Sequence, residues 1–247
     1  MRIPLGEIRL VTSCVLITAL CACVSVPTHD VDPVRLSQIK RIALLRIDPP
    51  SRMSVFSDAL SGDGFVGADI QNNLNNSHQE QFNQAVNERH TPFAATLRDS
   101  VRASLEKSGY RVEYLEDEWS LIAVNGKTDA DAILSVTYGY TGYKDFGSRF
   151  YDPLVTVQVR LSDPKTYELI YYRLFISGYK QDINSAVFIP IEGFHHYYLF
   201  STLMNEFDNA ADQLLRGASA IGAAIGPDLQ ASRGRGAGAT ALPATAP

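Results

Sequence analysis

Three cysteines are the first residues of the chain whose type and spacing could do chemistry. Cys14, Cys21 and Cys23 all lie within the first tenth of the 247 residues. A Cys-x-Cys pair can belong to a metal site or a redox site, but no later cysteine exists to complete either one. Ahead of the pair, Arg2 and Arg9 introduce an uncharged run at residues 10–20. This layout is typical of a secretory signal, and the run is shorter than the roughly 20 residues of a membrane-spanning helix.

The four residues Leu-Cys-Ala-Cys at positions 20–23 resemble the lipobox of bacterial lipoproteins. That motif has Leu at −3, small residues at −2 and −1, and a lipidated Cys at +1. Cys23 fits the +1 position, whereas Cys21 at +1 would place Leu20 where a small residue is required. The resemblance implies a diacylglyceryl thioether on Cys23, cleavage before it, and acylation of the new amine by a fatty acid such as palmitate. Two or more acyl chains anchor a protein stably. An ordinary cleaved signal and an uncleaved anchor are the alternatives.

The residues after Cys23 predict a location. In the lipoproteins of Gram-negative bacteria, Asp after the lipidated Cys favours retention in the inner membrane, and here Val24 and Ser25 follow. We therefore expect a lipid anchor in the outer membrane, on its periplasmic face. Residues 1–22 are then the signal peptide. Residues 23–38, which include Pro27 and Pro33, are expected to form a tether with turn chemistry.

The remaining residues offer little that predicts catalysis. The formal net charge is −5 and no basic stripe occurs, which excludes a nucleic-acid partner. "NGKT" at residues 125–128 lacks the earlier glycine of a phosphate-binding loop, because Leu121 occupies that position. His195 and His196 would face opposite ways on a strand, which disfavours joint metal ligation. We predict no catalytic residue, no cofactor and no metal site.

An aromatic loop is the candidate for a binding surface. The stretch "TYGYTGYKDFGSRFY" at residues 137–151 holds more aromatic residues and glycines than the end of a strand needs. Core packing and cross-strand pairs explain most aromatic residues in strands. An exposed aromatic loop would instead suit a partner interface. The predicted patch consists of Tyr143, Phe146 and Phe150.

The first half of the chain predicts a strand, two helices and a second strand. Residues 41–47 form a short apolar run closed by two prolines, which favours a buried strand. Spacings of four predict an amphipathic helix over about 68–88 and a second helix that ends at Gly109. Residues 110–115 then alternate like a strand. This order predicts a crossover between parallel strands.

The second half predicts mainly strands. Residues 130–140 form one, and residues 154–161 alternate strictly before "SDPKT", where a turn leads into a partner strand. A last helix is predicted to stop at Gly226–Pro227, followed by a disordered tail at 227–247. The predicted core includes Ile42, Leu44, Leu97, Val101, Ile133, Val157 and Leu214.

The segments "KRIALLRI", "LRDSVRASLEKSGYRVEYL", "ADAILSVTYGY" and "VTVQVRLSDPKTYELIYY" resemble the periplasmic αβ-sandwich of the TolB N-terminal domain and the curli-secretion lipoproteins. The resemblance implies an α/β fold in which helices pack on one mixed β-sheet. The resemblance covers roughly residues 39–222. We expect a single αβ-sandwich domain over residues 39–226, with residues 67–90 as an inserted amphipathic helix. Tyr167 stands where this pattern often has Gly.

Together these features predict a lipid-anchored periplasmic protein of the cell envelope. We expect a non-catalytic binding or assembly component, not an enzyme, whose partners are the membrane through its anchor and other envelope proteins or further copies of itself. A periplasmic hydrolase with scattered site residues is the alternative. A cleft with converging ionisable groups would favour the hydrolase.

Overall fold

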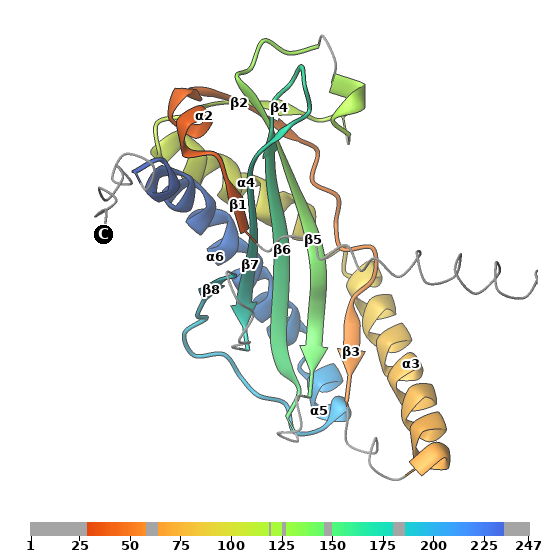
Figure 1. Cartoon of the computed structure of the whole chain (residues 1–247). Helices are drawn as coiled ribbons and strands as arrows, with labels where there is room; N and C mark the ends of the chain where they lie inside the picture. Colours follow the sequence, from red (N-terminus) through yellow and green to blue (C-terminus); the bar gives the residue numbers. More distant parts are fainter. Residues whose placement is uncertain are drawn as a thin grey trace, which may run out of the picture.

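The helices and strands come from a computed structural model that describes residues 29–57, 64–118, 120–124, 127–145, 150–179 and 186–234, without the side chains of 29–30 and 64–68. Among these residues, no helix is both long enough and apolar enough to cross a bilayer. The elements follow in chain order (Figure 1): β1 (His29–Val31), α2 (Pro33–Gln38), β2 (Arg41–Leu45), β3 (Ser54–Phe56), α3 (Gly64–Glu88), α4 (Phe93–Lys107), β4 (Arg111–Leu115), the 3₁₀ turn η2 (Ile122–Val124), β5 (Ala132–Lys144), β6 (Asp152–Ser162), β7 (Leu169–Gly178), β8 (Val187–Ile189), α5 (Phe200–Asn205) and α6 (Phe207–Gly234).

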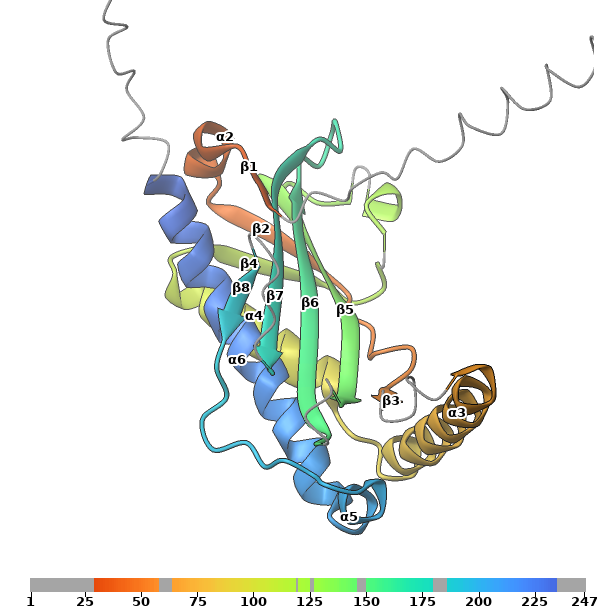
Figure 2. The same cartoon turned by 60° about the horizontal axis from the view of Figure 1, so that its bottom comes forward.

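One mixed sheet of eight strands organises the domain. Its order is β1-β7-β6-β5-β2-β4, with β3 also beside β5 and β8 beside β7. β2 is parallel to both β4 and β5, whereas β5, β6 and β7 form an antiparallel meander. Helices α4 and α6 lie side by side on one face of the sheet (Figures 1 and 2). This arrangement confirms the predicted mixed sheet packed by helices.

The local patterns of the sequence account for the best predicted elements. β2 and β4 are parallel, as the crossover predicts, and Gly109 between α4 and β4 has a φ of +83°, which favours glycine. The hairpin between β6 and β7 also forms, because the Asp163 carboxylate accepts hydrogen bonds from the N–H groups of Lys165 and Thr166 at 2.8 and 2.9 Å. Tyr167 follows with a φ of +60°. Glycine at this position would avoid the strain of a left-handed backbone.

The core lies between the sheet and helices α4 and α6. All seven predicted core residues have no exposed surface. Six of them belong to this core, whereas Ile133 belongs to a second, smaller cluster that includes Val124 of η2. Helices α4 and α6 approach closely because Gly222 and Gly226 face α4. The Ser104 hydroxyl donates to the Gly222 carbonyl at 2.7 Å, and a Cβ at Gly226 would lie 2.3 Å from the Ser104 carbonyl oxygen. Small residues therefore set the distance between the two helices.

The predicted tether at residues 23–38 is wrong for residues 29–38, which belong to the fold. β1 pairs antiparallel with β7, and the Asp32 N–H donates to the Ile170 carbonyl at 2.7 Å. Asp32 then caps α2 by accepting from the Arg35 N–H at 3.0 Å, and Pro33 occupies the first turn of the helix. The Asp and Pro residues that suggested a turn are instead the cap and the first turn of a helix. Leu36 is fully buried, so α2 is tied to the core.

The last helix also departs from its predicted end. α6 continues through Pro227 to Gly234, although a proline inside a helix costs about 3 kcal/mol. Contacts beyond the proline offset that cost. The Tyr171 hydroxyl donates to Asp228 at 2.6 Å, and the Gln230 amide donates to the Ser108 carbonyl at 2.5 Å. The domain therefore occupies residues 29–234 rather than 39–226, and residues 235–247 lie outside the described residues.

Helix α3 exists as predicted, but its apolar stripe is only half buried. Phe82 is fully buried, whereas Ile70 and Leu74 are 50% and 43% exposed. The residues buried in this part of the helix are the polar Gln71 and Asn75. Polar contacts therefore replace apolar packing over the first turns of α3.

Two asparagines explain this polar face. The Asn75 amide exchanges two hydrogen bonds with the backbone of Ser57, at 3.0 and 3.1 Å. The Asn83 amide does the same with Met53, at 2.7 and 2.8 Å. Eight residues of helix rise about 12 Å and four residues of strand about 13 Å, so the two spacings match. The helix thus takes the place of a neighbouring strand along the segment that contains β3.

Candidate functional site

The three residues of the predicted patch differ in how the structure places them. Tyr143 is fully buried, and its hydroxyl donates to the Ala210 carbonyl of α6 at 3.0 Å. Its prediction as an exposed binding residue is wrong, because β5 extends as a strand to Lys144 and directs this ring into the core. Phe150 is 39% exposed. Phe146 lies outside the described residues, as does Cys23.

Phe150 belongs to a group of rings that we call the aromatic patch: Phe150, Phe194, His196 and Tyr198. The Phe150 ring centroid lies 5.7 Å from those of both His196 and Tyr198, and the Phe194 centroid lies 4.7 Å from that of His196. Tyr198 is 58% exposed, and Leu199 beside it 54%. Large apolar groups gathered in this way on a surface are typical of an interaction site.

A short backbone bridge positions the patch. Tyr151 and Tyr197 exchange backbone hydrogen bonds at 2.7 and 3.2 Å, which joins the start of β6 to the segment before α5. Tyr197 is fully buried, and its hydroxyl accepts from the side-chain amides of Asn209 and Gln213 at 3.0 and 3.1 Å. These hydrogen bonds to α6 fix the segment before α5, and the rings on either side of Tyr197 remain at the surface.

The His196 Nδ1 atom forms a hydrogen bond with the Asp152 carboxylate. The Asp152 side chain is only 2% exposed, whereas that of His196 is 51% exposed. Burial raises the pKa of Asp152, although the histidine acts in the opposite direction. The pair orients the imidazole at the surface. Residues 194–196 lie outside any strand, and the His195 ring contacts Tyr197, whereas the His196 ring contacts Phe150 and Phe194.

A groove of about 560 Å³ adjoins the patch, and its lining includes Ser57, His78, Asp145, Tyr151 and Tyr198. The Ser57 hydroxyl donates to the Asp145 carboxylate at 3.2 Å. The His78 Nδ1 atom lies 3.5 Å from the Tyr151 hydroxyl, and the His78 ring stacks on Phe200 at 3.8 Å. Burial lowers the pKa of His78, so its imidazole is neutral near pH 7.

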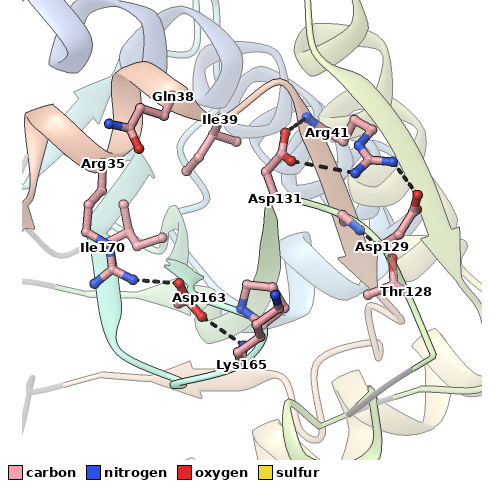
Figure 3. Close-up of a pocket in the computed structure, with 12 residues that line it drawn as sticks. Arg35, Gln38, Ile39, Arg41, Thr128, Asp129, Asp131, Asp163, Lys165 and Ile170 are labelled. Carbon is pink, nitrogen blue, oxygen red and sulfur yellow. Dashed lines mark hydrogen bonds and ion pairs between the residues drawn. The ribbon is translucent and has the colours of Figure 1, made fainter.

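A second pocket, of about 790 Å³, lies between α2, the start of β2 and the β6–β7 hairpin (Figure 3). Arg35 pairs with Asp163 at 2.7 Å on one side of it. On the other side Arg41 pairs with Asp129 and Asp131. Figure 3 shows that these carboxylates point toward the arginines. The paired charges of the pocket therefore tie α2 to the hairpin, and the start of β2 to residues 129–131.

The charged pocket has the character of a structural cluster. The Asp131 carboxylate accepts from the backbone N–H groups of Lys40 and Arg41 at 2.9 and 2.8 Å. Burial acts to raise the pKa of Asp131, but these hydrogen bonds prevail and lower it. Within the described ranges, no group of three or more His, Cys, Asp or Glu side chains is arranged to hold a metal ion.

The patch residues on the segment before α5 are the ones that sequence reasoning missed. "FHHYYLF" at residues 194–200 is dense in aromatic residues, which was the available signal. The sequence pattern does not show that the segment crosses the end of the sheet and meets Phe150 there. That contact spans more than 40 residues of chain and depends on the Tyr151–Tyr197 bridge.

No protein-family model and no curated protein matches the sequence. The chain is similar to the PelC dodecamer from Paraburkholderia phytofirmans, with 14% identity over 61% of this chain and 76% of that one, at a TM-score of 0.32. Protein XCC0632 from Xanthomonas campestris is 9% identical over 81% and 88%, with a TM-score of 0.42. Lipoprotein GNA1162 from Neisseria meningitidis is 13% identical over 69% and 96%, with a TM-score of 0.31. TM-scores this low transfer no function, so the function must be inferred from this chain's own residues.

Proposed function

We propose that this protein is a lipoprotein of the bacterial envelope, anchored through Cys23, whose domain binds another envelope protein through the aromatic patch. The observation that carries the anchor is the lipobox-like sequence at positions 20–23 after the uncharged run at 10–20. Val24 and Ser25 favour the outer membrane, with the domain on the periplasmic side. The role is one of binding or assembly rather than catalysis.

The aromatic patch supports the binding role. Tyr and Phe are enriched where proteins make their strongest contacts, because large rigid rings bury much area at a low entropic cost. Here the rings contact one another before any partner arrives, and the buried Asp152 orients His196 among them. A surface ordered in this way needs little rearrangement on binding.

Processing tests the anchor in cells. Cys23→Ala should leave unprocessed precursor, because the lipidated thiol is the signal that precedes cleavage. Cys21→Ala is the matched control and should be processed normally, since Ala suits the −2 position. Normal processing of Cys23→Ala would contradict the lipobox interpretation.

Site-specific photo-crosslinking tests the patch. A photoreactive residue in place of Tyr198 should capture a defined envelope protein in intact cells. The control is the same residue in place of Ile122, which is 79% exposed on η2, away from the patch. Equal capture from both positions, or capture from Ile122 alone, would contradict the proposal.

The hydrolase alternative is favoured by one observation, the groove that brings Ser57, Asp145 and a neutral His78 together. Serine, an acid and an imidazole are the groups of nucleophilic hydrolysis. Purified protein should then hydrolyse an activated ester, and Ser57→Ala should abolish the activity without unfolding the domain, since the lost hydrogen bond to Asp145 costs only about 1 kcal/mol. Activity that persists in Ser57→Ala, or its absence from the wild type, would reject this alternative.

A further inference from the structure

The reach of the lipid anchor follows from where the fold begins. The sequence predicts a tether of residues 23–38, which would span up to about 55 Å. The structure places residues 29–38 in the domain, since β1 pairs with β7 and α2 packs on the core. Only residues 24–28 then separate the lipidated Cys23 from His29. Six residue steps span at most about 22 Å in any conformation.

The sheet order shows which part of the domain this short tether holds. β1 is an edge strand, and α2 follows it directly. Helix α3 packs on β3, beyond the opposite side of the β7-β6-β5 meander. Four strand spacings of about 4.8 Å and the width of a helix separate β1 from α3, about 30 Å in all. Figures 1 and 2 both show α3 and β1 beyond opposite edges of the β7-β6-β5 meander.

The side chains near β1 support contact with a lipid surface. Val34 on α2 is 66% exposed, and it lies five residues from His29. The open face of the sheet carries Thr137, Gln158 and Arg160, which are exposed and polar. That face also carries the half-buried Tyr172 and Leu174 on β7, so Val34 is the most exposed apolar side chain near the start of the fold, although it is not the only apolar one.

We propose that the edge formed by β1 and α2 lies on the bilayer with Val34 at the lipid surface, and that α3 is held on the far side, facing away from the membrane. This placement rests on the proposed lipidation of Cys23. It also gives a meaning to the exposed Ile70 and Leu74 of α3, which the tether keeps away from the lipid.

Single cysteine probes test this placement. Cys14 and Cys21 leave with the signal peptide and Cys23 is blocked as a thioether, so an introduced cysteine is the one reactive thiol. Val34→Cys and Ile70→Cys are matched, because both replace exposed aliphatic residues. Each lipidated variant is labelled with a fluorophore and reconstituted into phosphatidylethanolamine vesicles that contain lipids with nitroxide headgroups. Flotation of the vesicles first shows that the protein is anchored.

The label at Val34→Cys should be quenched at least twofold more than the label at Ile70→Cys. Equal quenching, stronger quenching at Ile70→Cys, or no quenching in protein that floats would overturn the placement while leaving the anchor intact. Protein that does not float and lacks acyl mass would overturn the anchor and the placement together.

Lengthening the tether tests the cause. Sixteen Gly and Ser residues inserted after Ser25 add a flexible chain with a typical extension of about 22 Å. Quenching at Val34→Cys should then fall toward the value at Ile70→Cys. Unchanged quenching would show that the short tether does not impose the orientation.

Discussion

Replacement of Tyr143 tests whether this residue belongs to the core or to the binding surface. Tyr143 has no exposed area, its ring lies edge-on to Phe82 and Tyr197 at 5.9 and 5.5 Å, and its hydroxyl donates to Ala210 at 3.0 Å. Truncation of a buried aromatic ring costs about 3–5 kcal/mol. Tyr143→Ala should lose that much of a total stability of roughly 5–15 kcal/mol. Tyr143→Phe keeps the ring and should lose about 1 kcal/mol, the contribution of one hydrogen bond.

Phe150→Ala is the surface control. Its ring is 39% exposed, so its loss should cost less than about 1 kcal/mol. Urea unfolding followed by circular dichroism measures all three variants, and equal slopes would confirm that only stability differs. If Tyr143→Ala does not fold, Tyr143→Phe still gives a measurement. A loss below about 1 kcal/mol for Tyr143→Ala, or an equal loss for Phe150→Ala, would refute the assignment of Tyr143 to the core.

Three further predictions concern the packing that holds the site. Gly226→Ala should destabilise the domain by about 1–3 kcal/mol in thermal unfolding, because its Cβ would lie 2.3 Å from a carbonyl oxygen of α4. Gly234→Ala in the same helix is the control: its Cβ would contact nothing, so it should be neutral or slightly stabilising. Asn83→Ala should lower the free energy of unfolding, measured in urea, by about 1–3 kcal/mol, because it removes the hydrogen bonds to the N–H and C=O groups of Met53. Asn87 is exposed one turn later on the same helix, so Asn87→Ala should change stability by less than about 0.5 kcal/mol. Burial raises the pKa of Asp152 above its value in the unfolded chain, so protonation of this carboxyl favours folding at low pH, and that contribution is lost as pH rises through the folded pKa. The free energy of unfolding of Asp152→Asn, relative to that of the wild type, should therefore increase between pH 4 and pH 7. A decrease over this range would contradict the predicted sign.

Local patterns predicted much of this fold, and long-range contacts decided the rest. The stripe of α4 and the hairpin at Asp163 depend on residues close in sequence, so periodicity and turn chemistry predicted both. The place of residues 29–31 depends on pairing with β7, 140–144 residues later. The course of α6 past Pro227 likewise depends on contacts with distant residues such as Tyr171. No local pattern carries that information.

The binding surface could be predicted in part for the same reason. Aromatic density pointed to the region of Phe150, but whether a ring is buried depends on the length of β5 and on what α6 covers. Tyr143 therefore entered the core although its neighbours in sequence resemble a loop. His196 and Tyr198 joined the surface through a bridge that only the folded chain forms.

Mass spectrometry of the N-terminal peptide of the mature protein is the decisive test of the proposed lipid anchor. Lipidation at Cys23 should give a peptide that begins at Cys23, with a thioether-linked diacylglyceryl group and an acylated amine. A mature chain that begins at another residue, or a peptide in which the Cys23 thiol is free, would contradict it.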